Sequence, residues 1–201
     1  MRRSLFLLPF LAAIPGLSYA QHSTQIPIVN AGFEALVLNC SPSSIDSGGC
    51  WNAADPGWQP EWFNLGSGGT FRPGPNQFPG GVPGGVNCGY VGTVAEGIGG
   101  IFQALSATLQ ANTTYILRMY IGHRADNVFT GYQASLLAGG IEIASDNTLN
   151  PAAGTFLEDT ITVSIGTTSP LLGQVLAISI KSVGDQGQVD IDNVSLTAIS
   201  E

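Results

Sequence analysis

Alternating apolar and polar residues predict several short β-strands, most of them in the second half of the chain. The clearest case is TTYILRMYIG (113–122), where Tyr115, Leu117, Met119 and Ile121 share one face. An apolar residue at every second position is the pattern of a strand with one buried face. Further strands are predicted at 86–94, 131–140, 141–145, 159–165, 174–182 and 188–196.

Two segments of the chain are less regular. IPIVNAGFEALVL (26–38) offers two short strands joined by a hinge. In 97–109 the apolar residues fall at helical spacing, but the glycines there would each weaken a helix by about 1 kcal/mol. We therefore interpret 97–109 as a strand that runs into a loop. No convincing helix remains in the sequence.

The predicted strands are joined by turns that contain glycine and proline. Gly139 and Gly140 separate two of them and are typical of a two-residue hairpin turn. Many short strands with such turns indicate an all-β protein. We predict a single antiparallel β-sandwich domain, most simply a jelly roll, over residues 21–201.

The first twenty residues have the character of a secretory signal peptide. Arg2 and Arg3 precede the apolar run LFLLPFLAAI, which is too short to span a bilayer. Small residues at Ser18 and Ala20 then suit cleavage before Gln21. We expect a secreted, extracellular or periplasmic protein without membrane insertion.

The charge balance restricts the class of partner. Loss of Arg2 and Arg3 with the leader moves the formal net charge from −8 to −10. Nucleic acids and anionic membranes bind clusters of Lys and Arg, which this chain lacks. Neutral ligands such as sugars, or cations such as calcium, fit the charge better.

Three cysteines are present, so they cannot all pair within the chain. Cys40 and Cys50 bracket a short loop of turn-forming residues, and we predict a disulfide between them. Cys88 is then left over. The sequence leaves three roles for it: a buried thiol, an intermolecular bridge, or the true partner of one of the other two.

Residues 39–85 form a long segment rich in Gly and Pro that contains many aromatics. Trp51, Trp58, Trp62 and the nearby Tyr90 are candidates for ligand binding, because a sugar ring stacks its apolar face on an exposed aromatic. The alternative is that these side chains are buried under the loops as a second small core. GHRAD adds His123 and Arg124 as further candidates for ligand binding.

Oxygen-bearing side chains lie near both ends of the predicted domain. Glu34 follows the start of the fold, and VDIDNVSL (189–196) places Asp190, Asp192 and Asn193 in the closing strand. If the first and last strands pair, these side chains would meet. Calcium prefers such hard oxygen ligands. The alternative is that they are solvent-facing or turn residues.

Four motifs resemble, in order, galactose-binding-like jelly rolls, which include many carbohydrate-binding modules. They are VNAGFE, PGW at 56–58, TTYILRMYIG and IDNVSL. GTFRPGPNQFPGGVPGGVNCGYV and GHRADNVFTGYQASLLAGG look like exported bacterial proteins with a PEP-CTERM sorting tail, although that tail is absent here. The resemblance implies a structural calcium held by Glu34 and Asp192. It implies no such role for Asp190, which we interpret as a surface acid.

These observations together predict a secreted, non-catalytic module that binds carbohydrate or another extracellular polymer and holds one structural Ca²⁺. The alternative is an adhesive or self-assembling matrix protein. A hydrolase is less favoured, because no nucleophile motif accompanies His123 and no pair of acids is singled out by spacing.

Overall fold

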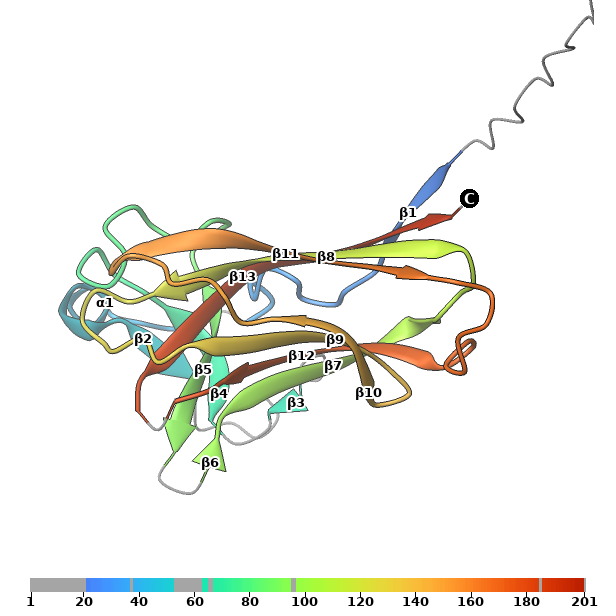
Figure 1. Cartoon of the computed structure of the whole chain (residues 1–201). Coiled ribbons are helices and arrows are strands. Elements are labelled where there is room, and N and C mark those ends of the chain that lie inside the picture. The colour runs from blue at the N-terminus through green and yellow to red at the C-terminus, as the bar shows by residue number, and fades with distance from the viewer. Residues whose placement is uncertain are drawn as a thin grey trace, which may run out of the picture.

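The computed structural model describes residues 21–36, 38–52, 63–64, 67–94, 97–184 and 186–200. Two antiparallel sheets face each other as a sandwich, which confirms the predicted fold class (Figure 1). The predicted signal peptide lies outside the described residues. Among the residues described, no helix has the length and apolar character needed to cross a membrane.

In the part of the chain that the structure describes, the larger sheet has eight strands, and its main path runs β11–β8–β13–β5–β4–β2. The strand β1 pairs with β13 beside this path, and β6 pairs with β5. The bounds are β1 (His22–Ile26), β2 (Cys50–Asn52), β4 (Gly68–Arg72), β5 (Cys88–Val94), β6 (Gly97–Ile98), β8 (Thr113–His123), β11 (Thr155–Ile165) and β13 (Gln188–Ser200).

The smaller sheet has five strands in the order β10–β9–β12–β7–β3. Their bounds are β3 (Phe63–Asn64), β7 (Gly100–Thr108), β9 (Tyr132–Ala138), β10 (Ile141–Asp146) and β12 (Val175–Ser182). Gly139 and Gly140 make the predicted hairpin turn between β9 and β10, and both have positive φ angles.

The main core lies between the two sheets. The alternating residues of β8, from Tyr115 to Ile121, are buried there as predicted. They meet the apolar face of the smaller sheet, which includes Leu136, Leu176 and Ile178. The period-two pattern is thus accounted for by burial of one face of each strand.

The closing strand β13 changes face at a β-bulge. Val189 and Ile191 point into the core, and after the bulge Val194 does so as well. The pairing register with β8 shifts between Asp192 and Ser195, and Asn193 between them has a φ angle of 49°. Asp190 and Asp192 therefore point to the opposite face of the sheet.

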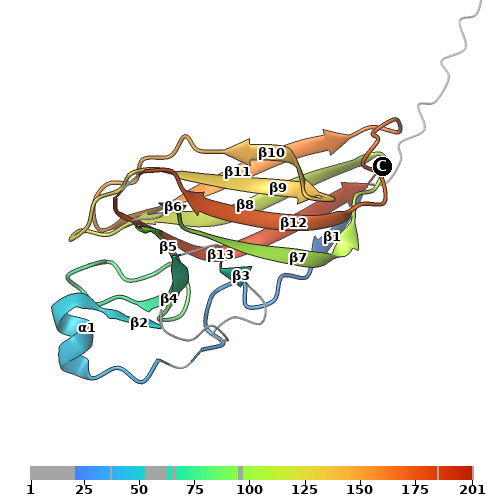
Figure 2. The same cartoon turned by 90° about the horizontal axis from the view of Figure 1, so that it is seen from below.

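The structure also contains elements that the sequence pattern did not reveal. Helix α1 (Pro42–Gly48) lies in the segment expected to be mostly loop. Ser41 caps it by accepting a hydrogen bond from the Ser44 N–H (3.1 Å), and Pro42 occupies its first turn. Figure 2 shows α1, β2 and β4 together at one end of the sandwich, away from the C-terminus.

The start of the described chain also differs from expectation. The first strand is β1, from His22 to Ile26, rather than two strands within 26–38. Turns follow it, and Asn30 and Phe33 adopt positive φ angles there. Phe33 is nevertheless fully buried, because it packs into the core from a turn.

Gly89 of β5 provides a test of this packing. A Cβ atom at Gly89 would lie 2.5 Å from the Phe33 ring, whereas one at Gly80 would meet nothing within 4 Å. We expect Gly89→Ala to destabilise the fold by about 1–3 kcal/mol through overpacking, and Gly80→Ala to leave it unchanged. Urea denaturation of both variants measures this. Equal stabilities of the two variants would contradict the close packing of the Phe33 ring against Gly89.

Candidate functional site

The candidate site lies on the outer face of the larger sheet, where β13, β5 and β8 run side by side. Asp190 of β13 pairs directly with Tyr90 of β5 and with Gly122 of β8. Residues directly opposite one another on antiparallel strands share a face, with Cβ atoms about 5 Å apart. The Asp190 carboxyl and the Tyr90 ring are therefore neighbours.

An aromatic cluster covers this part of the sheet. Phe71, Phe78, Cys88 and Tyr90 are buried together, away from the main core. Phe156 of β11 packs against them, with its ring centroid 4.4 Å from that of Phe78. The cluster forms because the segment between β4 and β5 folds back over the outer face of the sheet. An apolar environment thus surrounds the polar side chains of β13.

Asp190 is completely buried at this site. Its Oδ1 accepts a hydrogen bond from Gln188 Nε2 (2.7 Å), and the Cys88 Sγ lies 3.8 Å away. Its Oδ2 is buried and has no hydrogen-bond partner among the residues that the structure describes. Burial raises the pKa of Asp190 to about 7, although Gln188 and the charge of Arg124 act in the opposite direction.

The interpretation of Asp190 as a surface acid is therefore wrong. Period-two alternation correctly places it on the face opposite Val189 and Ile191. It does not tell whether that face meets water. The segment that covers it comes from more than 100 residues earlier in the chain, so no local pattern signals the burial.

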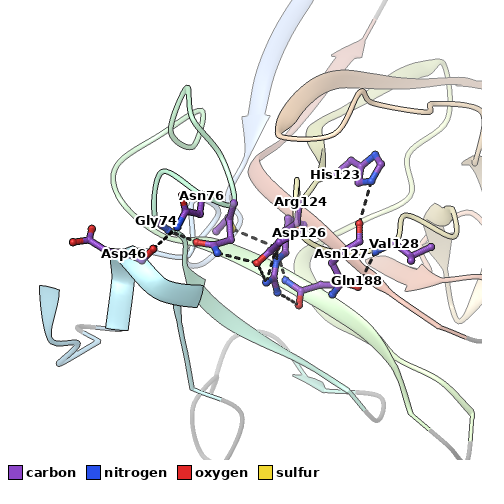
Figure 3. Close-up of polar contacts among 12 residues, drawn as sticks. Asp46, Gly74, Asn76, His123, Arg124, Asp126, Asn127, Val128 and Gln188 are labelled. Carbon is purple, nitrogen blue, oxygen red and sulfur yellow. Dashed lines mark hydrogen bonds and ion pairs between the residues drawn. The ribbon is translucent and has the colours of Figure 1, made fainter. Parts of the chain in front are cut away.

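Arg124 follows β8 and is nearly buried beside this acid. Its Nε and Nη2 donate to the two carboxylate oxygens of Asp126, each at 2.9 Å, and its Nη1 donates to Gln188 Oε1 at 2.9 Å (Figure 3). The guanidinium group also lies 4.8 Å from the Phe71 ring centroid and 5.1 Å from that of Trp51. Hydrogen bonds and aromatic contacts together hold it in place.

Asp126 is the ionised partner of this arginine. Burial alone would raise the pKa of Asp126, but the hydrogen bonds from Arg124 and from Gln77 Nε2 (2.9 Å) lower it overall. Gln77 is itself fully buried, and its Oε1 accepts the Gly74 N–H at 2.9 Å. The loop before β5 is thereby connected to the site by hydrogen bonds.

The structure gathers three of the residues that the sequence singled out for ligand binding. Trp51, Tyr90 and Arg124 lie at this site, and Trp51 is 42% exposed where it stacks on Phe71. Trp58 and Trp62 fall outside the described residues. Gln188 and Cys88 were not predicted from the sequence to belong to the site, because neither is part of a recognisable motif.

His123 does not join this cluster. Its two ring nitrogens lie 2.9 Å from the Pro151 carbonyl oxygen and 3.3 Å from that of Asn127, and its ring is close to Phe129. Figure 3 shows its side chain on the far side of Arg124 from Gly74. The imidazole therefore anchors loops, and it is not placed to serve a nucleophile.

The structure confirms the predicted disulfide and selects one of the three roles left open for Cys88. Cys40 and Cys50 form the disulfide, and Cys88 is a buried free thiol. The disulfide closes the loop that contains α1. It also anchors Cys50, the residue that precedes Trp51 in β2. Burial, followed by the charges of Asp190 and Asp192, raises the pKa of the Cys88 thiol well above its usual value. The thiol is therefore un-ionised and unreactive near neutral pH.

Glu34 and Asp192 meet at one corner of the site. Glu34 Oε1 accepts the N–H groups of Val86 (2.8 Å) and Asn87 (2.6 Å), and Asp192 Oδ2 accepts that of Gly84 (2.8 Å). Both acids thus hold the same loop. Within the described ranges, no three His, Cys, Asp or Glu side chains gather as a metal site. Calcium binding by this pair stays a prediction.

Two cavities border the aromatic cluster, on either side of the segment from Pro79 to Val82. One, of about 340 Å³, is lined by Phe78, and the other, of about 550 Å³, by Phe156. Their size suits a small molecule. Asp190 is not among the residues that line either cavity. The arrangement as a whole is a buried carboxyl group of raised pKa beside aromatic side chains.

Two solved structures of similar chains are cyclases. A Stig cyclase, Fisc, from Fischerella sp. TAU, in complex with (3Z)-3-(1-methyl-2-pyrrolidinylidene)-3H-indole, is 30% identical with a TM-score of 0.76, over 90% of this chain and 100% of that one. A cyclase from Fischerella sp. TAU in complex with 4-(1H-indol-3-yl)butan-2-one is 30% identical with a TM-score of 0.75, over 89% and 99% of the two chains. No curated protein sequence matches.

A more distant structure shares only the fold. An arabinose-bound α-L-arabinofuranosidase is 13% identical, with a TM-score of 0.55 over 87% of this chain and 26% of that one. The jelly-roll sandwich is therefore shared with carbohydrate-active proteins, which explains the resemblance seen in the sequence. The link to exported PEP-CTERM-type proteins is not supported.

The predicted function is wrong in three respects. The similar proteins are cyclases rather than non-catalytic modules, and the two complexes contain small indole compounds rather than carbohydrate or another polymer. The same similarity to cyclases also contradicts the two alternative functions, an adhesive or matrix protein and a hydrolase. Exposed aromatics misled the interpretation, because a tryptophan or tyrosine face can stack on the apolar face of a sugar and also on a flat aromatic ring such as an indole.

The sequence profile of the HpiC1-like cyclase family, described as HpiC1 cyclase, matches residues 24–197. This match includes all of the strands from β2 to β12 and nearly all of β13, so it contains every described residue of the site. The chain belongs to the HpiC1-like cyclase family.

Proposed function

We propose that this protein is a cyclase that closes a ring in a small indole-bearing molecule, with Asp190 as the proton donor. The observation that carries the proposal is the Asp190 carboxyl group. It is fully buried beside aromatic side chains, and one of its oxygens has no partner among the described residues. No described side chain therefore competes with a substrate for this oxygen.

The environment of Asp190 suits a general acid. Burial raises its pKa to about 7, so a large share of the carboxyl groups carry a proton at neutral pH. A general acid works best when its pKa lies near the working pH. The neighbouring Asp126 is ionised and paired with Arg124, so it does not compete for this role.

The proposed step is an isomerisation that needs no oxidant or reductant. The Oδ2–H of Asp190 protonates a basic atom of the substrate, such as the ring nitrogen of a 3H-indole, and leaves a carbocation-like electrophile. A π bond of the same molecule attacks this centre and forms the new ring bond. Loss of a proton to the Asp190 carboxylate then restores both the acid and the charge balance.

The aromatic cluster would assist this chemistry in two ways. The faces of Tyr90 and Phe156 carry negative quadrupole charge, which stabilises a nearby cation by about 0.5–2 kcal/mol. Their flat surfaces also suit the stacking of an indole ring. The ligands of the two Fischerella cyclases, an indole and a 3H-indole, support this substrate class.

The role of Asp190 can be tested by substitution. We expect Asp190→Asn to lower kcat by about 10²–10⁴-fold, the usual share of a general acid, because the amide cannot give up a proton. The assay incubates the protein with indoles and 3H-indoles that carry a pendant alkene, and detects products of unchanged mass with a new ring. Binding of 4-(1H-indol-3-yl)butan-2-one, followed by calorimetry, should survive the substitution.

Glu158→Gln is the matched control, since it removes an exposed carboxylate from the same sheet. It should leave the rate unchanged. Full turnover by Asp190→Asn would rule out the proposed acid. Absence of both binding and turnover for every compound in the wild-type protein would refute the cyclase itself.

The rate should also depend on pH in a defined direction. Only the protonated form of Asp190 is active, and the pKa of its carboxyl group in the substrate-free protein is raised to about 7, so kcat/KM should be constant at low pH and fall as pH rises through about 7. A profile measured from pH 5 to 9 checks this. A rate that rises across this range would instead indicate a catalytic base.

Export of the protein is a separate proposal. The Cys40–Cys50 disulfide is compatible with an oxidising compartment. The leader-like character of residues 1–20 supports it further. Expression of the full chain in a bacterial host should yield a periplasmic or secreted protein that begins at Gln21. Mass spectrometry of the purified product decides this, and an intact leader on cytoplasmic protein would contradict it.

A further inference from the structure

We propose that Arg124 and Gln188 are positioning residues, which together hold the transferable proton of Asp190 on Oδ2. The inference rests on the proposed function of Asp190 as proton donor, and it adds the reason why that proton faces the substrate. Two hydrogen bonds of fixed direction connect Arg124 to Gln188 and Gln188 to Asp190.

The first link is the orientation of the Gln188 side-chain amide. A guanidinium group can only donate hydrogen bonds. Because Arg124 Nη1 lies 2.9 Å from this amide, the atom that faces it must be the acceptor Oε1. A flipped amide would place two donors against each other. Arg124 therefore leaves Gln188 a single orientation.

The second link is the choice of oxygen on Asp190. With Oε1 facing Arg124, the Nε2 of Gln188 points at Asp190 Oδ1, 2.7 Å away. A proton on Oδ1 would then face this N–H group, and the two donors would repel. The Cys88 Sγ, 3.8 Å from Oδ1, can serve as a second, weaker donor to the same atom. The proton of the carboxyl group is left on Oδ2.

The third link is the fixed position of Arg124. Asp126 binds Nε and Nη2 in a bidentate pair, and the rings of Phe71 and Trp51 lie beside the guanidinium plane. Figure 3 shows Arg124 between Asp126 and Gln188, with dashed contacts to both. The arginine therefore cannot swing away to form an ion pair with Asp190. Gln188 lies between the two groups. It transmits to Asp190 the hydrogen-bond orientation that Arg124 imposes, while the positive charge of Arg124 stays out of direct contact with the carboxyl group.

A kinetic experiment separates positioning from simple structural support. We expect Gln188→Leu and Arg124→Met each to lower kcat by about 10–100-fold, as the loss of such supporting contacts commonly does, with KM unchanged. Arg124→Lys should recover most of the loss, since lysine also only donates. The double variant should be no slower than Gln188→Leu alone, because Arg124 acts through Gln188. Additive losses, or equal rates for Arg124→Met and Arg124→Lys, would overturn the proposal.

Gln133→Leu is a matched control. Its Nε2 also donates to a carboxylate, that of Glu142 at 2.9 Å, but on the smaller sheet and in solvent. This variant should retain full activity. Melting curves identify any variant that fails to fold, and in that case Gln188→Glu supplies a second test. Its carboxylate would pair with Arg124 and present no donor to Asp190, so the proton would no longer be held on Oδ2, and kcat should fall as in Gln188→Leu.

An infrared measurement detects the hydrogen bond between Gln188 Nε2 and Asp190 Oδ1 without any substrate. The difference spectrum between wild type and Asp190→Asn at pH 5 isolates the C=O stretch of the protonated carboxyl group. Gln188→Leu should move this band to higher wavenumber, because the carbonyl oxygen Oδ1 loses its donor. An unmoved band would overturn the proposal. A moved band in a protein that turns over no indole would support the positioning role and contradict the cyclase instead.

Discussion

Strand β13 has partners on both sides within the larger sheet, and the rest of the structure depends on this arrangement. It pairs with β8 along one edge and with β5 and β1 along the other. Its alternation sends Val189 and Ile191 into the core and Asp190 to the opposite face. A carboxyl group in the middle of a sheet cannot reach bulk water once a loop covers that face. Its protonation state is then set by the protein rather than by solvent.

The loop that covers this face is held by charged and polar groups rather than by a second sheet. Glu34 and Asp192 accept backbone N–H groups of residues 84–87, and Gln77 ties the preceding turn to Asp126. Burying carboxyl groups is costly unless each has a partner or gives up its charge. Asp126 keeps its charge beside Arg124, whereas Asp190 is shifted toward the neutral form. Two acids of the same type thus acquire different roles.

Much of the fold could be predicted because it depends on local patterns. Burial of one face imposes a period of two, and this identified β8, β11 and β12 correctly. The pairing of Cys40 with Cys50 followed from their short separation. Helix α1 was missed because it is short and is specified by the Ser41 cap rather than by an apolar period. The candidate site was only partly foreseen: Trp51, Tyr90 and Arg124 were named, but for a sugar ligand.

By itself, the sequence determined the all-β sandwich, its core-facing residues and its disulfide, since each depends on neighbours a few residues apart. Only the tertiary structure decided that Asp190 is buried and faces Tyr90, and that Gln188 stands between it and Arg124. Asp190 and Tyr90 are 100 residues apart in the chain, and Gln188 and Arg124 are 64 apart. The acidity of a carboxyl group depends on the solvent and charges around it in space. A sequence read along its length does not contain that information.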